Sequence, residues 1–243
     1  MDAEELLRTT GSVRRFTADP VDDSTLYAIL DHARFAPSGG NRQAWRVVVV
    51  KDPERRQQLG DLMRPVWTEY LTISATGRTP FAAVDAAPYA IPAALSASAP
   101  NDLIEGIVDV PVVLVIGADL GSVAMMDKDL DRPPIVGGAS IYPFCWNLLL
   151  AARTRGLGGV LTTFLCRAEA EAAAGLGLPP TYALAATVFL GHPVHQPTNL
   201  KRRPVEAFTT IDRFDGPTFD GPTLDGPTLD GPTLDGPTLD GPT

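Results

Sequence analysis

The chain has 243 residues, of which 44% are apolar, and its formal net charge is −9. Six of the acidic residues lie in a terminal repeat, residues 215–243, that contains no Lys or Arg, so residues 1–214 carry a net charge of only −3. A nearly neutral body gives no electrostatic argument for nucleic acid as a partner.

Cysteine usage and hydropathy indicate the compartment. Cys145 and Cys166 are the only cysteines, and they lie in no zinc or dithiol spacing, which is typical of a reducing compartment. The longest apolar run, residues 110–118, contains Pro111 and is far too short to span a bilayer. Because the N-terminus is acidic, it does not resemble a signal peptide. We therefore expect a soluble, cytoplasmic protein with no membrane partner.

The first half of the chain predicts two helices and one strand. A cluster of Asp and Ser at residues 22–24 favours a helix start, and apolar residues at helical spacing continue until the break before Pro37. Residues 47–50 are four consecutive valines, which we interpret as a strand buried on both faces. Asp52 then caps a second helix that has Pro53 at its first position.

The second half predicts two more buried strands and two helices. Residues 112–117 and 183–190 are the strands. Between them, residues 142–155 form an apolar helix that ends at Gly156, and residues 167–174 form a short helix that ends at Gly175.

Two segments lack regular patterns. Residues 77–106 contain several Pro and Ser, and we expect a long, partly helical excursion of the kind that often covers a site. Residues 215–243 repeat Asp-Gly-Pro-Thr followed by Leu or Phe, which excludes a helix or a central strand and supplies too little apolar surface to fold. We expect a folded domain over residues 1–214, with a real core, and a disordered tail over residues 215–243.

Motifs for several enzyme classes are absent. The sequence has no P-loop, no dinucleotide fingerprint, no Gly-x-Ser-x-Gly and no His pair at metal-ligand spacing. Lone His residues such as His32, His192 and His195 are more often structural or solvated than catalytic. The sequence therefore favours chemistry carried by a cofactor over acid–base hydrolysis.

Two cation clusters and one polar turn are the candidate binding residues. Arg14 and Arg15 lie near the N-terminus, and Lys201 and Arg202 lie far along the chain. Each cluster is either a solvated face or one half of a phosphate clamp. The second alternative is open because the planar guanidinium of Arg offers a fork of N–H donors to phosphate oxygens. The turn at residues 36–45 is rich in Pro, Ser and Gly, so its backbone N–H groups can approach a bound molecule closely.

Over roughly residues 4–214 the chain resembles the nitroreductase family of FMN-dependent enzymes. The matching stretches, in family order, are 12–16 (Ser-Val-Arg-Arg-Phe), 20–21 (Pro-Val), 36–45 (Ala-Pro-Ser-Gly-Gly-Asn-Arg-Gln-Ala-Trp), 138–143 (Gly-Ala-Ser-Ile-Tyr-Pro), 147–152 (Asn-Leu-Leu-Leu-Ala-Ala), 156–158 (Gly-Leu-Gly), 190–193 (Leu-Gly-His-Pro) and 202–206 (Arg-Arg-Pro-Val-Glu). The resemblance implies an α+β, three-layer fold with a central, mainly antiparallel sheet flanked by helices. It also implies a homodimer whose flavin sites lie at the subunit interface.

The resemblance also assigns roles to residues of this sequence. Ser12, Arg14 and Arg15 would bind the phosphate, ribityl and pyrimidine parts of FMN, and Arg202 with Lys201 would hold the phosphate. Backbone groups of Leu161, Thr162 and Thr163 would lie beside the isoalloxazine ring near N5. The turn residues Pro37, Ser38, Gly39, Asn41 and Gln43 would contact the flavin, the first four from the other subunit. Tyr142 either contacts the cofactor or is an aromatic residue of the core.

The function implied is an FMN-dependent oxidoreductase. It would transfer hydride from NADPH or NADH through flavin N5 to a nitroaromatic, a quinone or a related electron-poor acceptor, in a ping-pong reaction. One alternative is a flavin-binding carrier or interaction protein without turnover. Another is a flavin-dependent dehydrogenase or dehalogenase, since fold alone does not choose among these activities.

The sequence departs from the family pattern in three places. Thr10 and Gly11 stand where a basic residue is usual, which would remove one phosphate contact. Ala44 replaces a Pro before Trp45, and Trp146 replaces a Gln. Trp146 either narrows the acceptor site or packs in the core.

Overall fold

The computed structural model describes residues 1–84 and 100–221. The chain divides into two compact units, Met1–Thr198 and Asn199–Thr243, and each is described by itself. Among the described residues, no helix combines the length and the apolar character needed to cross a bilayer.

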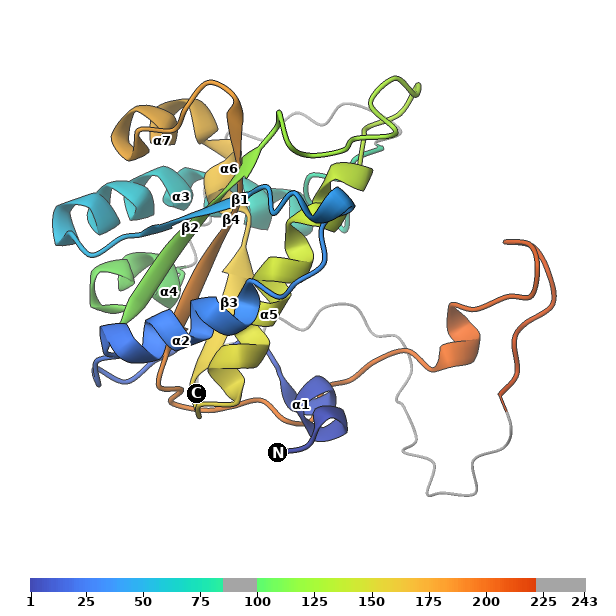
Figure 1. The fold of residues 1–243 in the computed structure, drawn as a ribbon, viewed down its shortest axis with the longest axis horizontal. Coiled ribbons are helices and arrows are strands. Elements are labelled where there is room, and N and C mark those ends of the chain that lie inside the picture. Colours follow the sequence, from blue (N-terminus) through green and yellow to red (C-terminus); the bar gives the residue numbers. More distant parts are fainter. Residues whose placement is uncertain (85–99, 222–243) are drawn as a thin grey trace. The chain divides into compact units, whose positions relative to one another are not determined.

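The first unit is built on a four-stranded sheet in the order β1-β2-β4-β3 (Figure 1). Every pair of neighbouring strands is antiparallel. The strands are β1 (Trp45–Val49), β2 (Val112–Asp119), β3 (Gly158–Thr162) and β4 (Tyr182–Gly191). The predicted antiparallel sheet is therefore confirmed.

Helices cover both faces of this sheet and make three layers (Figure 1). Alternate residues of β2 point to opposite faces, so that Leu114 and Ile116 join one core while Val113 and Val115 join the other. The first core includes α2 (Asp23–Ala33) and α5 (Tyr142–Arg153); the second includes α3 (Pro53–Ser74), α4 (Asp102–Glu105), α6 (Phe164–Arg167) and α7 (Glu169–Leu176). The α+β, three-layer fold is as predicted.

The helix starts follow the predicted caps. The Asp22 carboxylate accepts a hydrogen bond from the backbone of Thr25, and that of Asp52 accepts one from Glu54. The predicted end at Gly175 is wrong: α7 continues to Leu176, and Gly177 at φ 62° ends it. Only glycine adopts this left-handed conformation without steric cost. The first helix, α1 (Ala3–Thr9), and the strand β3 were not among the predicted elements.

The prediction that residues 47–50 are buried on both faces is wrong. β1 lies at an edge of the sheet, and its side chains Val48 and Val49 are 39% and 36% exposed. A run of valines favours a strand, but its neighbours in the sheet decide whether that strand is central or at the edge.

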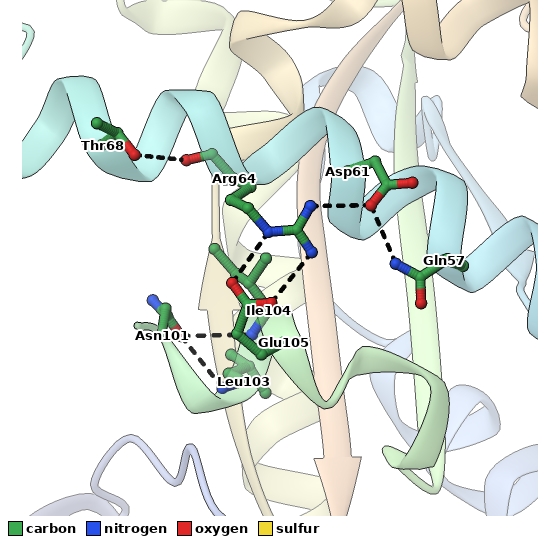
Figure 2. Close-up of polar contacts among 8 residues, drawn as sticks. All are labelled: Gln57, Asp61, Arg64, Thr68, Asn101, Leu103, Ile104 and Glu105. Atoms are coloured by element: carbon green, nitrogen blue, oxygen red, sulfur yellow. Dashed lines mark hydrogen bonds and ion pairs between the residues drawn. The ribbon is translucent and has the colours of Figure 1, made fainter. Parts of the chain in front are cut away.

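A charged network anchors the short helix α4 on α3 (Figure 2). Arg64 donates from Nε and Nη2 to the two carboxylate oxygens of Glu105, at 3.0 and 3.1 Å, and from Nη1 to Asp61 Oδ1 at 2.9 Å. Asn101 caps α4 by accepting from the Leu103 N–H at 3.2 Å. Within the predicted excursion at residues 77–106, α4 is the helix that the structure describes; residues 85–99 lie outside the described part.

The second unit begins at Asn199, and its described residues are mostly exposed. It contains the short 3₁₀ helix η4 (Val205–Ala207) and a bridge between Thr210 and Thr218. Arg213 and Asp215 form an ion pair at 2.7 Å. Most of the repeat, residues 222–243, lies outside the described residues, so its predicted disorder stays a prediction.

Candidate active site

The segment that carries Ser12 and the two arginines lies across one end of the sheet. Ser12 forms a parallel bridge with Gly159 at the start of β3, and Phe16 forms an antiparallel bridge with Pro193 just after β4. A Cβ atom on Gly158 would lie 2.5 Å from Cγ2 of Val13, so only glycine permits this approach. The glycines after α5 therefore seat the N-terminal segment against the sheet.

Arg14 and Arg15 are exposed and line a hollow of about 320 Å³. Asp102 and Asp109 line the same hollow. Within residues 1–84 and 100–221, neither guanidinium has a carboxylate or hydrogen-bond partner. Two exposed Arg forks without a bonded partner can each bind an anion, and Asp102 and Asp109 reduce the net positive charge of the hollow.

The turn at residues 36–45 is held in an unusual backbone conformation. Gly40, Asn41 and Gln43 have φ angles of 60°, 54° and 50°, a region that non-glycine residues rarely adopt. The Ser38 hydroxyl accepts from the Gln43 N–H at 2.9 Å, which closes the turn. Pro37, Asn41 and Gln43 are exposed, so the side chains expected to contact a ligand are accessible.

The same turn is joined to the 3₁₀ helix η3 (Val136–Ser140) that precedes α5. The N–H of Gly39 donates to the Ser140 hydroxyl at 3.1 Å, although the two residues are far apart in sequence. Nearby, the rings of Trp45 and Phe144 stack with centroids 4.7 Å apart. The turn and the start of α5 thus form one connected region.

Tyr142 is the first residue of α5 and is 45% exposed, so the interpretation of it as a core aromatic is wrong. Its hydroxyl donates to the Ala185 carbonyl at 3.3 Å. Partial burial raises the pKa of Tyr142 above its ordinary value. Trp146, one turn further along α5, is 40% exposed and is likewise not a core residue.

Leu161 and Thr162 end β3, which is an edge strand of the described sheet, and Thr163 follows as the residue before α6. Thr162 lies opposite Thr187 of β4. Within the described residues, both hydroxyl oxygens are buried and without a hydrogen-bond partner. At about 3.3 Å per residue, Thr163 is roughly 13 Å along the strand from Gly159, where Ser12 pairs.

The predicted residues of the first unit lie in separate places along the sheet. The turn and Tyr142 lie near the starts of β1 and β4, and β3 ends opposite Thr187, in the middle of β4. Ser12, Arg14 and Arg15 lie at the opposite end, where β3 begins and β4 ends. Lys201 and Arg202 are exposed residues of the second unit, and their predicted contact with the phosphate stays a prediction.

The two thiols are not poised for nucleophilic chemistry. Burial raises the pKa of Cys145 to about 12 and that of Cys166 to about 11. In the part of the chain that the structure describes, no group of three His, Cys, Asp or Glu residues could hold a metal ion.

The sequence interpretation missed an apolar pocket of about 360 Å³ beside Tyr142. Part of its wall comes from residues 120–135, which connect β2 with η3, and from η3 itself. The apolar residues Leu120, Met125 and Ile135 of that segment have no helical or strand periodicity, so only the folded chain brings them together.

A sequence profile of the Nitroreductase family matches residues 7–192, most of the first unit. The chain belongs to the nitroreductase family. Membership confirms the resemblance inferred from the ordered motifs.

Two curated relatives and one solved structure illustrate the similarity. A protein named NADH dehydrogenase from Thermus thermophilus is 30% identical over 232 aligned residues, covering 85% of this chain and 94% of the relative. A 5,6-dimethylbenzimidazole synthase from Rhodospirillum rubrum is 29% identical over 195 residues, covering 78% and 81%. The structure of NADPH:FMN oxidoreductase from Vibrio harveyi, complexed with NAD+, has a TM-score of 0.62 at 22% identity, covering 91% of this chain and 80% of that one.

These relatives agree with the enzyme class that the motifs imply. Family membership and the names of the relatives support an FMN-dependent NAD(P)H oxidoreductase. At 22% identity, the similarity to the Vibrio harveyi structure shows a shared fold. The identity of the electron acceptor has to be argued from the site.

Proposed function

We propose that this nitroreductase-family protein transfers hydride from NADH or NADPH, through N5 of bound FMN, to a nitroaromatic, a quinone or a related electron-poor acceptor. The observation that carries the proposal is the pair of exposed guanidiniums, Arg14 and Arg15, without counter-ions among the described residues. They lie at one end of β3, the strand whose other end reaches Thr162 and Thr163.

The residues present fit FMN. FMN is elongated, with a phosphate at one end and a flat ring system at the other. It can therefore lie along β3 with its phosphate near Arg14 and Arg15 at the start of the strand. The separation of roughly 13 Å between Gly159 and Thr163 gives room for the ribityl chain between them. When bound, FMN supplies a two-electron centre that accepts and donates hydride.

The protein residues bind and orient the cofactor in this proposal. Ser12, Arg14 and Arg15 bind the phosphate and the adjoining polar part of the ribityl chain, since the Arg fork offers several donors to an anion. The backbone of Leu161, Thr162 and Thr163 orients the ring near N5. Ser12 is exposed and can reach a ligand, whereas Thr10 cannot replace the missing cation, because it is buried and its hydroxyl donates to the Leu6 carbonyl at 2.6 Å.

The active form in this proposal is a cytoplasmic homodimer with one flavin site at each end of the subunit interface. The turn residues Pro37, Ser38, Gly39 and Asn41 then reach the flavin of the partner subunit, and Gln43 supports them. This arrangement accounts for the separation, within one chain, of the turn from Arg14 and Arg15. Donor and acceptor bind the same open face of the ring in turn, which gives ping-pong kinetics.

The decisive experiment records the visible spectrum of the full chain with FMN, without oxygen, before and after addition of NADH and of NADPH. Bleaching of the flavin bands by either nucleotide, and their return on adding an acceptor, is the expected result. A flavin spectrum that persists with both nucleotides would support a carrier without turnover. A protein that stays colourless after incubation with FMN would overturn the cofactor assignment.

A further inference from the structure

The pocket beside Tyr142 lies where β2, β4, η3 and α5 of the first unit meet. It has a volume of about 360 Å³, which is enough for a single aromatic ring with substituents. Its lining residues come from the end of β2, the segment after it, η3, the start of α5 and the first residues of β4. They are Ala118, Leu120, Val123, Met125, Pro134, Ile135, Gly137, Gly138, Ile141, Tyr142, Leu184 and Ala185.

Among the residues that the structure describes, none with a charged side chain lines this pocket. Its one polar side chain, Tyr142, already donates its hydroxyl to the Ala185 carbonyl. A carboxylate or sulfonate that entered would give up part of its hydration and find no cation among the described lining residues in return, which is unfavourable. The lining therefore selects for uncharged ligands.

Glycines give the pocket its shape. A Cβ atom on Gly138 would lie 2.9 Å from two ring carbons of Tyr142, and one on Gly137 would lie 2.8 Å from the Met125 methyl carbon. Both distances are shorter than ordinary van der Waals contacts, so the Tyr142 ring and Met125 pack directly on the backbone. These glycines are also part of η3, whose Ser140 holds the turn at Gly39.

Asp127 fixes the wall formed by the segment after β2. Its side chain is buried, and Oδ2 accepts from Arg132 Nη1 at 2.7 Å and from the Ile135 N–H at 2.8 Å. These hydrogen bonds hold the pKa of Asp127 below its ordinary value, the backbone donor at Ile135 being the main cause. The wall is thus formed before any ligand arrives.

We propose that this pocket binds the electron acceptor, and that it selects uncharged aromatic molecules over their carboxylated or sulfonated analogues. The inference rests on the proposed function, and it adds the substrate class. For a nitro compound the net reaction is a two-electron reduction. NAD(P)H and one proton convert the nitro group to a nitroso group, with one N–O bond broken, one water released and NAD(P)+ formed.

The test compares methyl 4-nitrobenzoate with 4-nitrobenzoate, which differ in charge and hardly in shape. With the full chain, FMN and NADPH or NADH, the ester is expected to have a kcat/KM about tenfold or more above that of the acid, because an unpaired buried carboxylate is costly. Equal values for the two compounds would overturn the inference.

A pair of variants checks that the pocket causes the preference. Leu120 lines the pocket and is 49% exposed, while Leu130 belongs to the same connecting segment, is 55% exposed and is not among the lining residues. Leu120→Arg should lower the ester-to-acid ratio of kcat/KM by about threefold, because an exposed ion pair between the new Arg and the carboxylate has an effect of that order. Leu130→Arg adds the same charge and should leave the ratio unchanged; equal effects of both variants would contradict the proposal.

Equilibrium dialysis of both compounds, with FMN present and no nicotinamide, separates this inference from the proposed function. If the ester binds selectively and Leu120→Arg alters that selectivity, but NAD(P)H is never oxidised, the proposed function fails and the pocket assignment stands. If NAD(P)H is oxidised but neither binding nor turnover depends on Leu120, only the pocket assignment fails. A change of sedimentation rate in Leu120→Arg would show instead that a second copy of the chain covers the pocket, which would also overturn the inference.

Discussion

Single side chains set the local geometry at helix starts and at close contacts. Asp22 accepts hydrogen bonds from the Ser24 hydroxyl and from the backbone and hydroxyl of Thr25. The capping role was readable from the sequence, because Asp, Asp and Ser in succession before an apolar helix favour it. The strength of the cap depends on the hydroxyl groups that turn toward the carboxylate in the folded chain.

Asp22 should make stability depend on pH in acid. These hydrogen bonds, led by that from Ser24, lower the pKa of Asp22 from 3.8 to about 2. Because the folded pKa is the lower one, the stabilisation is complete above pH 3.8 and is lost as the pH falls toward about 2. Asp22→Asn keeps a capping oxygen but does not titrate.

Urea unfolding of both proteins between pH 7 and pH 2.5 measures this effect. The advantage of the wild type over Asp22→Asn should be constant near neutrality and should shrink below about pH 4. A difference in unfolding free energy that stays constant through the acid range would contradict the assigned pKa.

Gly158 should be required for flavin binding as well as for stability. Alanine there would place Cβ 2.5 Å from Val13 Cγ2, forcing the segment with Arg14 and Arg15 away from β3. We expect Gly158→Ala to cost about 1–3 kcal/mol of stability, as overpacking does, and to weaken FMN binding measured by fluorescence titration. Gly221→Ala is the control, because no atom lies within 4 Å of its added Cβ. Unchanged FMN affinity in Gly158→Ala would separate this contact from the cofactor site.

At the scale of elements, Arg56 joins α3 to the sheet. Its guanidinium donates to the carbonyl oxygens of Val50 at 2.8 Å, Val108 at 2.9 Å and Val110 at 2.6 Å. Desolvation lowers the pKa of Arg56, which is the cost of holding its charge inside this cluster of carbonyls. The sequence contained no sign of this role, since the acceptors come from two separate parts of the chain, Val50 and residues 108–110.

Replacing Arg56 by Met should destabilise the protein strongly. Met keeps much of the apolar stem but leaves the carbonyls without their charged donor, so we expect a loss of about 2 kcal/mol in the free energy of unfolding. Arg8→Met, at a side chain that is 77% exposed and pairs only with Glu4, should change it by less than about 0.5 kcal/mol. Equal losses in the two variants, by urea unfolding, would show that the carbonyl cluster contributes nothing.

At the scale of the whole molecule, the family resemblance predicts that Arg202 binds the phosphate of FMN. Arg202→Ala should lower FMN occupancy by removing a charge-assisted hydrogen bond, worth roughly 1.5–3 kcal/mol or about tenfold or more in affinity. Sedimentation should show the same oligomeric state as the wild type. If FMN affinity is unchanged, Arg202 does not bind the phosphate, and Lys201, Ser12, Arg14 and Arg15 remain as the proposed candidates.

Removal of the repeat tests whether the tail is passive. A chain that ends at Phe214 should keep the FMN content and the NAD(P)H oxidation rate of the full chain, because each repeat offers only one Leu or Phe for burial. Absorbance and steady-state rates on matched samples give the comparison. A large loss of either quantity would mean that the repeat docks on the folded part.

The sequence by itself determined the family, the helix caps and the two central strands. It also identified the candidate binding residues, which are the cation clusters and the polar turn. These features depend on local patterns: spacing, capping chemistry and ordered motifs. Only the tertiary structure placed the valine run of β1 at an edge, added β3, and exposed Tyr142 and Trp146, because burial is decided by neighbours distant in sequence. For the same reason the pocket beside Tyr142 and the Arg56 cluster appeared only once distant segments had packed together.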